Sequence, residues 1–146
     1  MGPRMNLTWR CSDCGFTQPR PIAKLRATTL AFYDDARFPG RSVLVLNDHA
    51  TLIEDLPLEV ARDLALDVRQ AAAAIRAASG AQRMNYAAFG NVVPHVHVHL
   101  IPRHGDWETA PKATAWDHPE PERRLDGAAA ERIVAAIRER LRVASP

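Results

Sequence analysis

The chain has 146 residues, and 47% of them are hydrophobic, which is enough for one domain with a core of its own. Its 19 basic and 17 acidic residues leave a net charge of +2, so the charge balance requires neither nucleic acid nor a membrane as a partner. No apolar run approaches the roughly 20 residues of a membrane span, and the N-terminus lacks the apolar segment of a signal peptide. We therefore expect a cytoplasmic protein whose two cysteines form no structural disulfide.

The first segment carries both cysteines of the chain. Residues 1–10 have no clear hydrophobic period and are expected to be an irregular leader. Cys11 and Cys14 follow in a Cys-x-x-Cys spacing. This spacing suits one half of a tetrahedral zinc site, because two thiolates on a tight turn can share one ion. The alternative is a pair of unrelated free thiols.

Two prolines close this segment. Pro19 and Pro21 indicate a linker, since proline and glycine interrupt regular structure more strongly than other residues. The expected division is an N-terminal leader over residues 1–20, which holds the Cys-x-x-Cys pair, and a single domain over residues 21–146.

The first half of this domain predicts two strands and a helix. Residues 28–33 are rich in strand-forming side chains, and residues 42–46 are a short, nearly all-apolar stretch that is typical of a central strand. Asp55 and Pro57 predict the start of a helix, with Asp55 as its capping residue. Apolar residues then recur every three or four positions until Gly80, which favours the left-handed end of a helix.

The second half predicts two strands, a long loop and a last helix. Residues 84–89 and 95–101 are expected to be antiparallel neighbours, with Pro94 at the first position of the second strand. Residues 103–124 are expected to be a loop whose two tryptophans pack over the site. Asp126 predicts the cap of a helix with one apolar face. This order of elements predicts an α+β fold with an antiparallel sheet.

Three histidines alternate with aliphatic residues in the strand over residues 95–101. Successive side chains of a strand point to opposite faces, so His95, His97 and His99 are expected in a row on one face, roughly 6–7 Å apart. The row has three interpretations: a half-buried strand with imidazoles on its outer face, a metal site, or a catalytic site. Catalysis is favoured, because a neutral imidazole is a nucleophile and flanking imidazoles can orient it or stabilise an oxyanion.

The pattern His-φ-His-φ-His-φ-φ, where φ is apolar, resembles the signature of the histidine triad (HIT) superfamily. The flanking residues 90–94 and 102–103 are similar to its diadenosine-polyphosphate hydrolase-like bacterial branch. The resemblance implies that the helices pack on one face of the sheet and that the chain forms a homodimer. It also implies an enzyme that acts on a small nucleotide, with no role for nucleic acid or membranes.

The resemblance assigns chemical roles to the histidine strand and to the residues before it. His97 is expected to attack the α-phosphate of an adenine nucleotide and form a covalent nucleotidyl-histidine that water then opens. His99 and His95 flank it, with His99 placed to stabilise charge on the phosphate oxygens. Gly90 and Asn91 are expected to bind the phosphate through backbone N–H groups and the Asn91 amide.

The chain departs from the pattern of the family at several positions. Many relatives have a serine where this chain has Val92, so the preference for a leaving group is open. Several relatives have a histidine at the start of the second strand; its counterpart here lies near Ser42, so that contact is expected to be lost. Asp34 is expected to bind the ribose, with Asp35 as the competing candidate and a simple turn role as the alternative for either.

The resemblance also implies a zinc site. In some bacterial relatives zinc is held by a Cys-x-x-Cys pair, a histidine after the second strand and the first histidine of the triad. The matching residues are Cys11, Cys14, His49 and His95. Four such ligands leave no open position, so the zinc would be structural.

Three functions remain open from the sequence. The first is a hydrolase that cleaves a phosphoanhydride or related bond of an adenine nucleotide. The second is a nucleotidyltransferase or phosphorylase of the same superfamily, in which phosphate or another acceptor replaces water. The third is a non-enzymatic module that binds nucleotide or zinc, which the presence of His97 disfavours.

Overall fold

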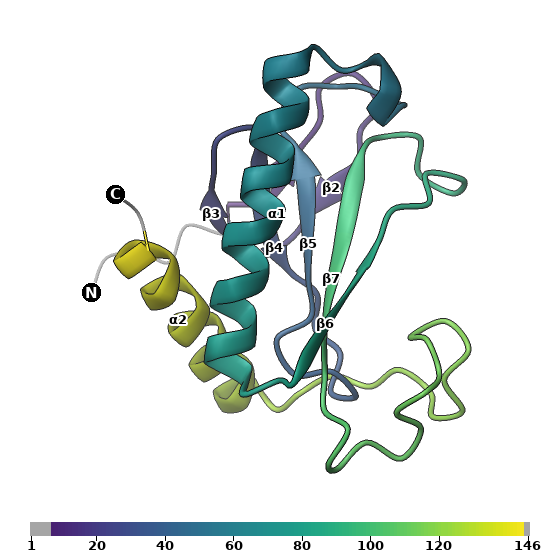
Figure 1. Ribbon diagram of the computed structural model, residues 1–146, viewed down its shortest axis with the longest axis vertical. Helices are drawn as coiled ribbons and strands as arrows, with labels where there is room; N and C mark the ends of the chain where they lie inside the picture. The colour runs from purple at the N-terminus through teal and green to yellow at the C-terminus, as the bar shows by residue number, and fades with distance from the viewer. Residues whose placement is uncertain (1–6, 145–146) are drawn as a thin grey trace.

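The computed structural model describes residues 7–144, and its elements form an α+β fold, as predicted (Figure 1). In chain order these elements are β1 (Trp9–Arg10), β2 (Thr17–Gln18), β3 (Pro21–Lys24), β4 (Thr28–Phe32), β5 (Ser42–Leu46), the 3₁₀ helix η1 (Ile53–Asp55), α1 (Leu58–Ser79), β6 (Arg83–Ala87), β7 (His97–Arg103) and α2 (Gly127–Ala144).

The central sheet has five strands in the order β3-β4-β5-β7-β6, and every neighbouring pair is antiparallel. The strands predicted over residues 28–33, 42–46 and 84–89 correspond to β4, β5 and β6. The predicted pairing of the histidine strand with residues 84–89 is confirmed as the β6–β7 pair. All five side chains of β5 are buried, as expected for a strand at the centre of the sheet.

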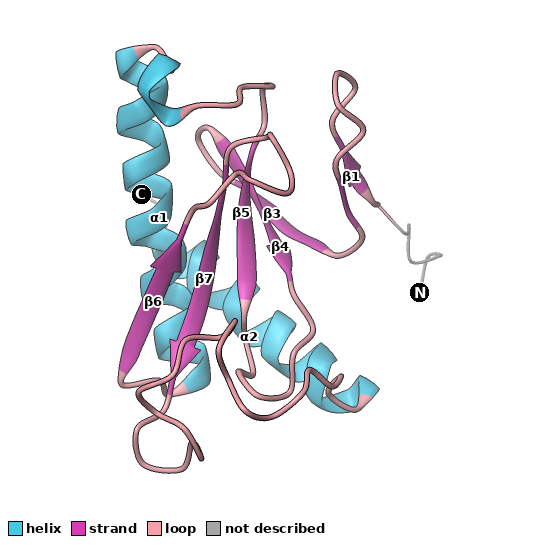
Figure 2. Cartoon of the chain, turned by 90° about the vertical axis from the view of Figure 1, so that its right-hand side faces the viewer, coloured by secondary structure: helices cyan, strands magenta, loops and turns pink. Residues whose placement is uncertain are grey.

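Both helices cover one face of the sheet (Figure 2). The main core joins α1 and α2 to alternate residues of the strands: Ile22, Leu30, Phe32, Leu44, Leu46, Val98 and Leu100. His97 and His99 lie opposite Val45 and Val43 in the β5–β7 register and point away from this core. A two-stranded hairpin, β1–β2, and the loop over residues 104–126 cover the histidine face.

The histidine strand begins later than the sequence predicts. Strand β7 starts at His97, so His95 is not part of the row that alternation predicted. A tight turn, closed by the bond from the His95 N–H to the Val93 carbonyl at 2.9 Å, directs the chain into the strand. Pro94 lies inside this turn and not at the first position of the strand, so that prediction is wrong. His95 is thereby free to point elsewhere.

The N-terminal segment is more regular than expected in its described part. Trp9 and Arg10 form β1, which pairs with β2, so the predicted irregular leader is wrong at these two residues. Residues 1–6 lie outside the described residues. The hairpin closes around the cysteines, because the Cys11 N–H donates to the Phe16 carbonyl and the Gly15 N–H donates to the Cys11 carbonyl, both at 2.9 Å. Gly15 has a positive φ of 77°, which glycine adopts without steric cost.

Pro21 belongs to the sheet and not to a linker. It opens β3, which pairs with β4 at the edge of the five-stranded sheet. Proline is tolerated there because the first residue of an edge strand need not donate to the ladder. The hairpin before it is a separate two-stranded sheet, and the division into residues 1–20 and 21–146 stays a prediction.

The helix ends agree with the sequence prediction at two of three points. Helix α1 is capped by Pro57 and not by Asp55, which lies at the end of η1 and makes no capping bond. Proline suits this place because its fixed φ is already close to that of a helix. Gly80 ends α1 with a φ of 72°, and Asp126 caps α2 by accepting the Ala129 N–H at 2.8 Å, as predicted.

The long loop after β7 covers the site with one of its two tryptophans. Trp116 contacts His99 edge to face, with ring centroids 5.1 Å apart, and also contacts Phe89. Trp107 instead stacks on His104 and does not contact the triad. The prediction of a packed loop is therefore right for Trp116 only.

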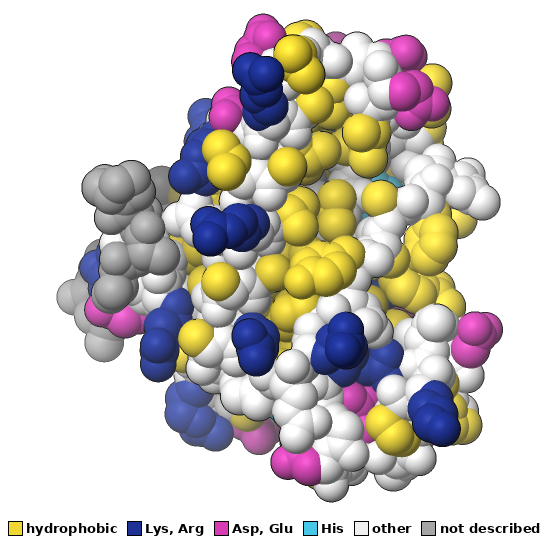
Figure 3. All heavy atoms as spheres, viewed as in Figure 1, with side chains coloured by type: hydrophobic (Ala, Val, Ile, Leu, Met, Phe, Trp, Pro, Cys, Tyr) yellow, Lys and Arg dark blue, Asp and Glu magenta, His cyan; other side chains and the backbone are white. Residues whose placement is uncertain are grey.

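An apolar surface runs along α1 and the unpaired edge strand β6 (Figure 3). Exposed apolar side chains of these elements include Leu58 and Leu66 on α1 and Tyr86 on β6, and Leu52 and Ile53 in the segment before α1 are exposed as well. In the described part of the chain, neither helix is long and apolar enough to cross a membrane.

Candidate active site and metal centre

His97 has one ring nitrogen fixed and the other free. Its Nδ1 lies 2.6 Å from the backbone carbonyl oxygen of His95, which can only accept a hydrogen bond. Nδ1 therefore carries the hydrogen, and Nε2 of the neutral ring presents a lone pair. That Nε2 atom makes no hydrogen bond to any described residue. His95 thus orients His97 through its backbone and not through its imidazole.

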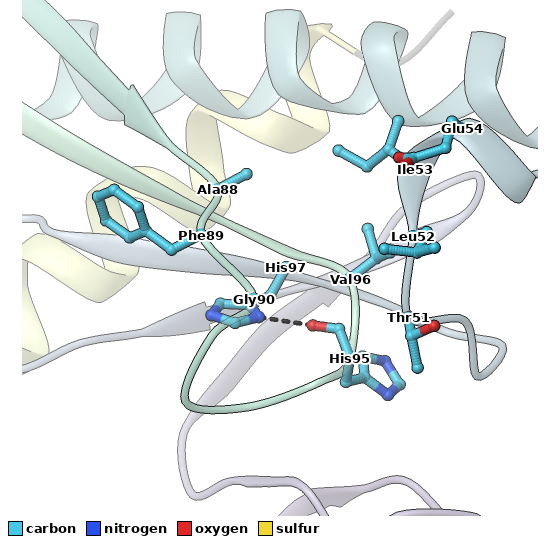
Figure 4. Close-up of a pocket in the computed structure, with 10 residues that line it drawn as sticks. All are labelled: Thr51, Leu52, Ile53, Glu54, Ala88, Phe89, Gly90, His95, Val96 and His97. Carbon is cyan, nitrogen blue, oxygen red and sulfur yellow. Dashed lines mark hydrogen bonds between the residues drawn. The ribbon is translucent and has the colours of Figure 1, made fainter.

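The His97 ring lies between two aromatic neighbours beside a small cavity. Phe16 from the cysteine hairpin and His99 from the same strand each have ring centroids 5.3 Å from it. The cavity has a volume of about 150 Å³ and is lined by Thr51, Leu52, Ile53, Glu54, Ala88, Phe89, Gly90, His95, Val96 and His97 (Figure 4). A half-buried imidazole beside an opening of this kind is accessible to a small molecule.

Gly90 and Asn91, the expected phosphate-binding residues, differ in their placement. Gly90 lines the cavity together with His97 and has a φ of 76°. No other atom would obstruct a side chain at Gly90, so its backbone conformation is what requires glycine. Asn91 is exposed and does not line this cavity. Gly90 therefore lies beside the same cavity as His97, whereas Asn91 lies at the surface of the same loop.

His99 is held on the other side of His97 in an apolar and cationic environment. The rings of Tyr33 and Trp116 contact it edge to face, at centroid distances of 6.3 and 5.1 Å. Its Nδ1 is buried and has no hydrogen-bond partner among the described residues. Burial, followed by the positive charge of Arg41 and the neighbouring His97, lowers the pKa of His99 to about 4. His99 is therefore neutral at pH 7 and has one N–H to donate.

Arg41 is a site residue that the sequence analysis did not identify. We expected a lost contact near Ser42, and Ser42 indeed bonds only the Gly40 carbonyl through its side chain. The preceding residue, Arg41, extends instead beside the triad: its guanidinium lies 4.0 Å from the Tyr33 ring centroid and 5.3 Å from that of Trp116. A cationic side chain, Arg41, therefore lies just before β5, near the position where several relatives have a histidine.

A buried carboxylate explains why Arg41 stays in place. Asp35 accepts bonds from Arg41 at 2.9 Å and from Arg37 at 2.8 Å, and all three side chains are almost inaccessible to solvent. Burial opposes ionisation of Asp35, but the bonds from the two arginines hold its pKa below the usual range. The sequence signal for this cluster was the Asp34-Asp35 pair, since a buried aspartate needs a cationic partner.

The same bonds separate the two candidates for the ribose contact. Both carboxylate oxygens of Asp35 are used inside the protein by the arginines. Asp34 follows Tyr33, whose ring contacts His99, and only its Oδ1 has a described partner, the Leu125 N–H at 2.9 Å. The competing assignment to Asp35 therefore has no free oxygen to offer, whereas Asp34 retains one.

The four residues expected to bind zinc converge in space. Ligand atoms of Cys11, Cys14, His49 and His95 all lie within 4.8 Å of one another. The Nδ1 atoms of His49 and His95 are 3.3 Å apart, and the sulfur-to-Nδ1 distances are 3.5 Å for Cys14–His95 and 3.7 Å for Cys11–His49. A tetrahedral zinc ion with ordinary bond lengths requires about 3.3 Å between nitrogens and about 3.6 Å between sulfur and nitrogen. The cluster therefore has the dimensions of a closed four-ligand site.

The protonation of these residues also suits a metal ion. His95 is fully buried, and its Nε2 lies 2.8 Å from the Leu46 carbonyl oxygen, so Nε2 carries the hydrogen and Nδ1 presents its lone pair to the cluster. A backbone hydrogen bond from Cys14 holds the pKa of the Cys11 thiol below its usual value. That shift favours the thiolate, the form that binds metals. The residues therefore fit a metal such as zinc.

Comparison with known proteins assigns the chain to a family. The HIT domain matches residues 22–106, which is more than half of the sequence. The chain therefore belongs to the HIT domain family, as the histidine pattern predicted. No protein of curated function matches the sequence.

Solved structures of bacterial HIT proteins share the fold. A histidine triad protein of Bradyrhizobium japonicum superimposes with a TM-score of 0.76 at 24% identity, covering 83% of this chain and 89% of that one. One from Sinorhizobium meliloti gives 0.74 at 24% identity, covering 82% and 87%. A zinc-bound histidine triad family protein of Mycobacterium smegmatis gives 0.61 at 20% identity, covering 84% of each chain. These similarities confirm the α+β HIT-like fold with helices on one face of the sheet.

Proposed function

We propose that this protein is a nucleotide hydrolase that cleaves a phosphoanhydride or related bond at the α-phosphate of an adenine nucleotide. The observation that carries the proposal is the free Nε2 lone pair of His97, fixed by the bond from its Nδ1 to the His95 carbonyl. A neutral imidazole oriented in this way is an activated nucleophile. Membership of the HIT family supports the choice of a nucleotide as the substrate.

The reaction proceeds in two displacements. In the first, the Nε2 lone pair of His97 forms a bond to the α-phosphorus, and the bond from that phosphorus to the leaving oxygen breaks with its electron pair. The leaving group departs as a phosphate anion or takes a proton from solvent. In the second, water attacks the same phosphorus, the P–N bond breaks, and the water proton passes to solvent. A nucleoside monophosphate leaves, and His97 regains its lone pair.

The neighbouring residues bind the substrate around the attacked phosphorus. His99 and the Gly90–Asn91 backbone contact the non-bridging oxygens, where negative charge increases in the transition state. Asp34 accepts hydrogen bonds from the ribose hydroxyls through its free oxygen. Phe16 packs on His97 and limits rotation of the ring during the attack.

We also propose that Cys11, Cys14, His49 and His95 hold one zinc ion. The distances within the cluster and the presence of zinc in a related structure support this choice of metal. Four protein ligands leave no open position, so the ion would link chain segments and not activate water. The residues then hold the hairpin against the sheet, with Phe16 over His97 and the His95 carbonyl in place.

The apolar side chains on α1 and the edge strand β6 support a homodimer. Exposed leucines and Tyr86 lie beside an unpaired strand edge, which can pair with the same edge of a second copy. The nearly balanced net charge of +2 supports a small-molecule substrate and not nucleic acid or a membrane as the partner.

A product analysis with purified protein tests the function. Dinucleoside polyphosphates and nucleoside phosphoramidates are offered as substrates, with and without added inorganic phosphate. The proposal expects a nucleoside monophosphate as the product, with no change in its identity when phosphate is added. Incorporation of phosphate into the nucleotide product would instead identify a phosphorylase. Absence of turnover with every substrate, in protein that binds nucleotide, would identify a binding module.

A further inference from the structure

Two buried polar atoms near the triad have no hydrogen-bond partner among the described residues: Nδ1 of His99 and Nε of Arg41. Leaving such atoms without partners is costly, so each requires an explanation. The two side chains share the same neighbours. Tyr33 and Trp116 each contact both the His99 ring and the Arg41 guanidinium. The same two rings therefore pack against both His99 and the Arg41 guanidinium, which places a buried cation near His99.

Arg41 is not free to act as a direct ligand for substrate. Its Nη1 donates to Asp35 at 2.9 Å, and Glu122 lies 3.8 Å away. Only 2% of its side chain is exposed, because the rings of Tyr33 and Trp116 enclose it. Its action on the reaction must therefore pass through a residue that can reach the substrate, and His99 is that residue.

We propose that Arg41 is a positioning residue that holds neutral His99 in the tautomer with its hydrogen on Nε2. A neutral imidazole has one N–H and one lone pair. An N–H on the buried Nδ1 would lack an acceptor among the described residues. The positive charge of Arg41 nearby disfavours a second positive dipole end in the same buried region and favours a lone pair there. The hydrogen is therefore placed on Nε2, the ring nitrogen that is not buried.

The two neighbouring histidines are then held in opposite tautomers. His97 carries its hydrogen on Nδ1, because the His95 carbonyl accepts it, and offers a lone pair at Nε2. His99 offers an N–H at Nε2, which can donate to a non-bridging phosphate oxygen in both displacements without transferring a proton. The statement about the tautomer stands on the structure alone, and its use in catalysis rests on the proposed hydrolase function.

Nitrogen-15 NMR of the histidine rings in the full-length protein tests the tautomer without any need for turnover. In the wild-type protein at pH 7 we expect His99 to show a protonated Nε2 and an unprotonated Nδ1, opposite to His97. In Arg41→Met we expect a measurable Nδ1–H population for His99, and in Arg41→Lys, which keeps the cation, a return toward the wild-type shifts. His99→Asn identifies the His99 signals.

Arg37→Met is the matched control. Arg37 donates to the same carboxylate of Asp35 as Arg41 does, but its guanidinium packs on Phe38 and not on the rings that contact His99. A purely structural effect of losing one partner of Asp35 would appear in both variants, whereas a change in the His99 tautomer is expected only for Arg41. A wild-type His99 with its hydrogen on Nδ1 overturns the proposal, and this result needs no variant to fold. Identical His99 shifts in folded Arg41→Met and wild type overturn it as well.

Kinetics then connect the tautomer to the reaction. Arg41→Met is expected to lower kcat on the order of tenfold, with a smaller change in KM, because the lost donor acts mainly in the transition state. In a His99→Asn background the same substitution should have no further effect on kcat, since Arg41 acts through His99. Additive losses in the double variant would overturn the positioning role. Confirmed tautomers in a protein without turnover would instead show that only the hydrolase function is wrong.

Discussion

The two ends of the histidine triad are built in different ways. At the His95 end, a hairpin turn and the segment after β5 bring four metal-binding atoms within 4.8 Å of one another. At the His99 end, Trp116 from a loop of more than twenty residues packs on the ring, and the buried Arg41 packs on Trp116. The arrangement at the His95 end depends on short sequence motifs. The arrangement at the His99 end depends on packing between segments that are distant in the sequence. His97 lies between them, so its chemistry depends on both.

The largest expected effect comes from removing the residue between the two ends. His97→Asn should lower kcat about a thousandfold or more, corresponding to ~4 kcal/mol in the barrier, with little change in nucleotide affinity. Steady-state kinetics and equilibrium binding measure the two effects. His118→Asn is the control, because His118 packs on Phe38 and makes no described contact with the triad. More than a tenth of wild-type activity in His97→Asn would contradict its role as the nucleophile.

Breaking the His95 end should affect stability and activity together. Cys11→Ser is expected to lose the metal, lower Tm on the order of 5 °C, or about 2 kcal/mol for a chain of this size, and lower kcat. Elemental analysis and thermal unfolding measure these changes. Ser12→Ala, an exposed change in the same turn, should leave both unchanged. Less than about a tenth of an equivalent of metal in active wild-type protein with reduced thiols would contradict the site.

Replacing Asp34, the proposed ribose ligand, should affect activity less than replacing His97 or Cys11. The effect should fall mainly on KM. Asp34→Ala is expected to raise KM about tenfold and to change kcat little, because ribose contacts are similar in the ground and transition states. Asp34→Asn keeps an acceptor for the Leu125 N–H, so it separates anchoring of the loop from binding of the ribose. A KM that stays at the wild-type value in Asp34→Ala would remove this residue from the site.

A pH dependence of stability is expected to belong to the His99 end. The pKa of His99 is about 4 in the folded chain and 6.5 in a free side chain, so the unfolded state takes up a proton first as pH falls. The free energy of unfolding should therefore decrease between about pH 6.5 and pH 4. His95, whose pKa burial also lowers, acts in the same direction. Denaturation of His99→Asn across this range should give a shallower decrease than His118→Asn, and equal slopes would contradict the burial of neutral His99.

The difference between the two ends also explains what the sequence could predict. The strands over residues 28–33 and 42–46 and the C-terminal end of α1 follow from local patterns. The cluster of two cysteines and two histidines that could hold a metal follows from the resemblance to the HIT family. The start of β7 does not, because a turn around Pro94 overrides the alternation of His95 with the later histidines. Alternation alone placed His95 in the row, whereas its side chain points to the cysteines.

The contacts of the His99 end lay beyond sequence analysis because they join distant segments. Arg41 is fixed by Asp35, six residues away, and by Glu122, far along the chain. No short spacing encodes such a cluster. The residue types alone indicated a turn with two aspartates and a loop with two tryptophans. Only the packing distinguishes the two tryptophans, because Trp116 contacts His99 and Trp107 contacts His104.

The most direct test of the central claim, that His97 is a covalent nucleophile, is mass spectrometry of the protein quenched rapidly during turnover at neutral to alkaline pH. A slowly hydrolysed adenine nucleotide serves as the substrate. The account predicts an added mass of one adenylyl group, located by peptide mapping on His97 and absent from His97→Asn. An adenylyl group on another residue, or continued turnover with no adduct on His97 at any quench time, would contradict it.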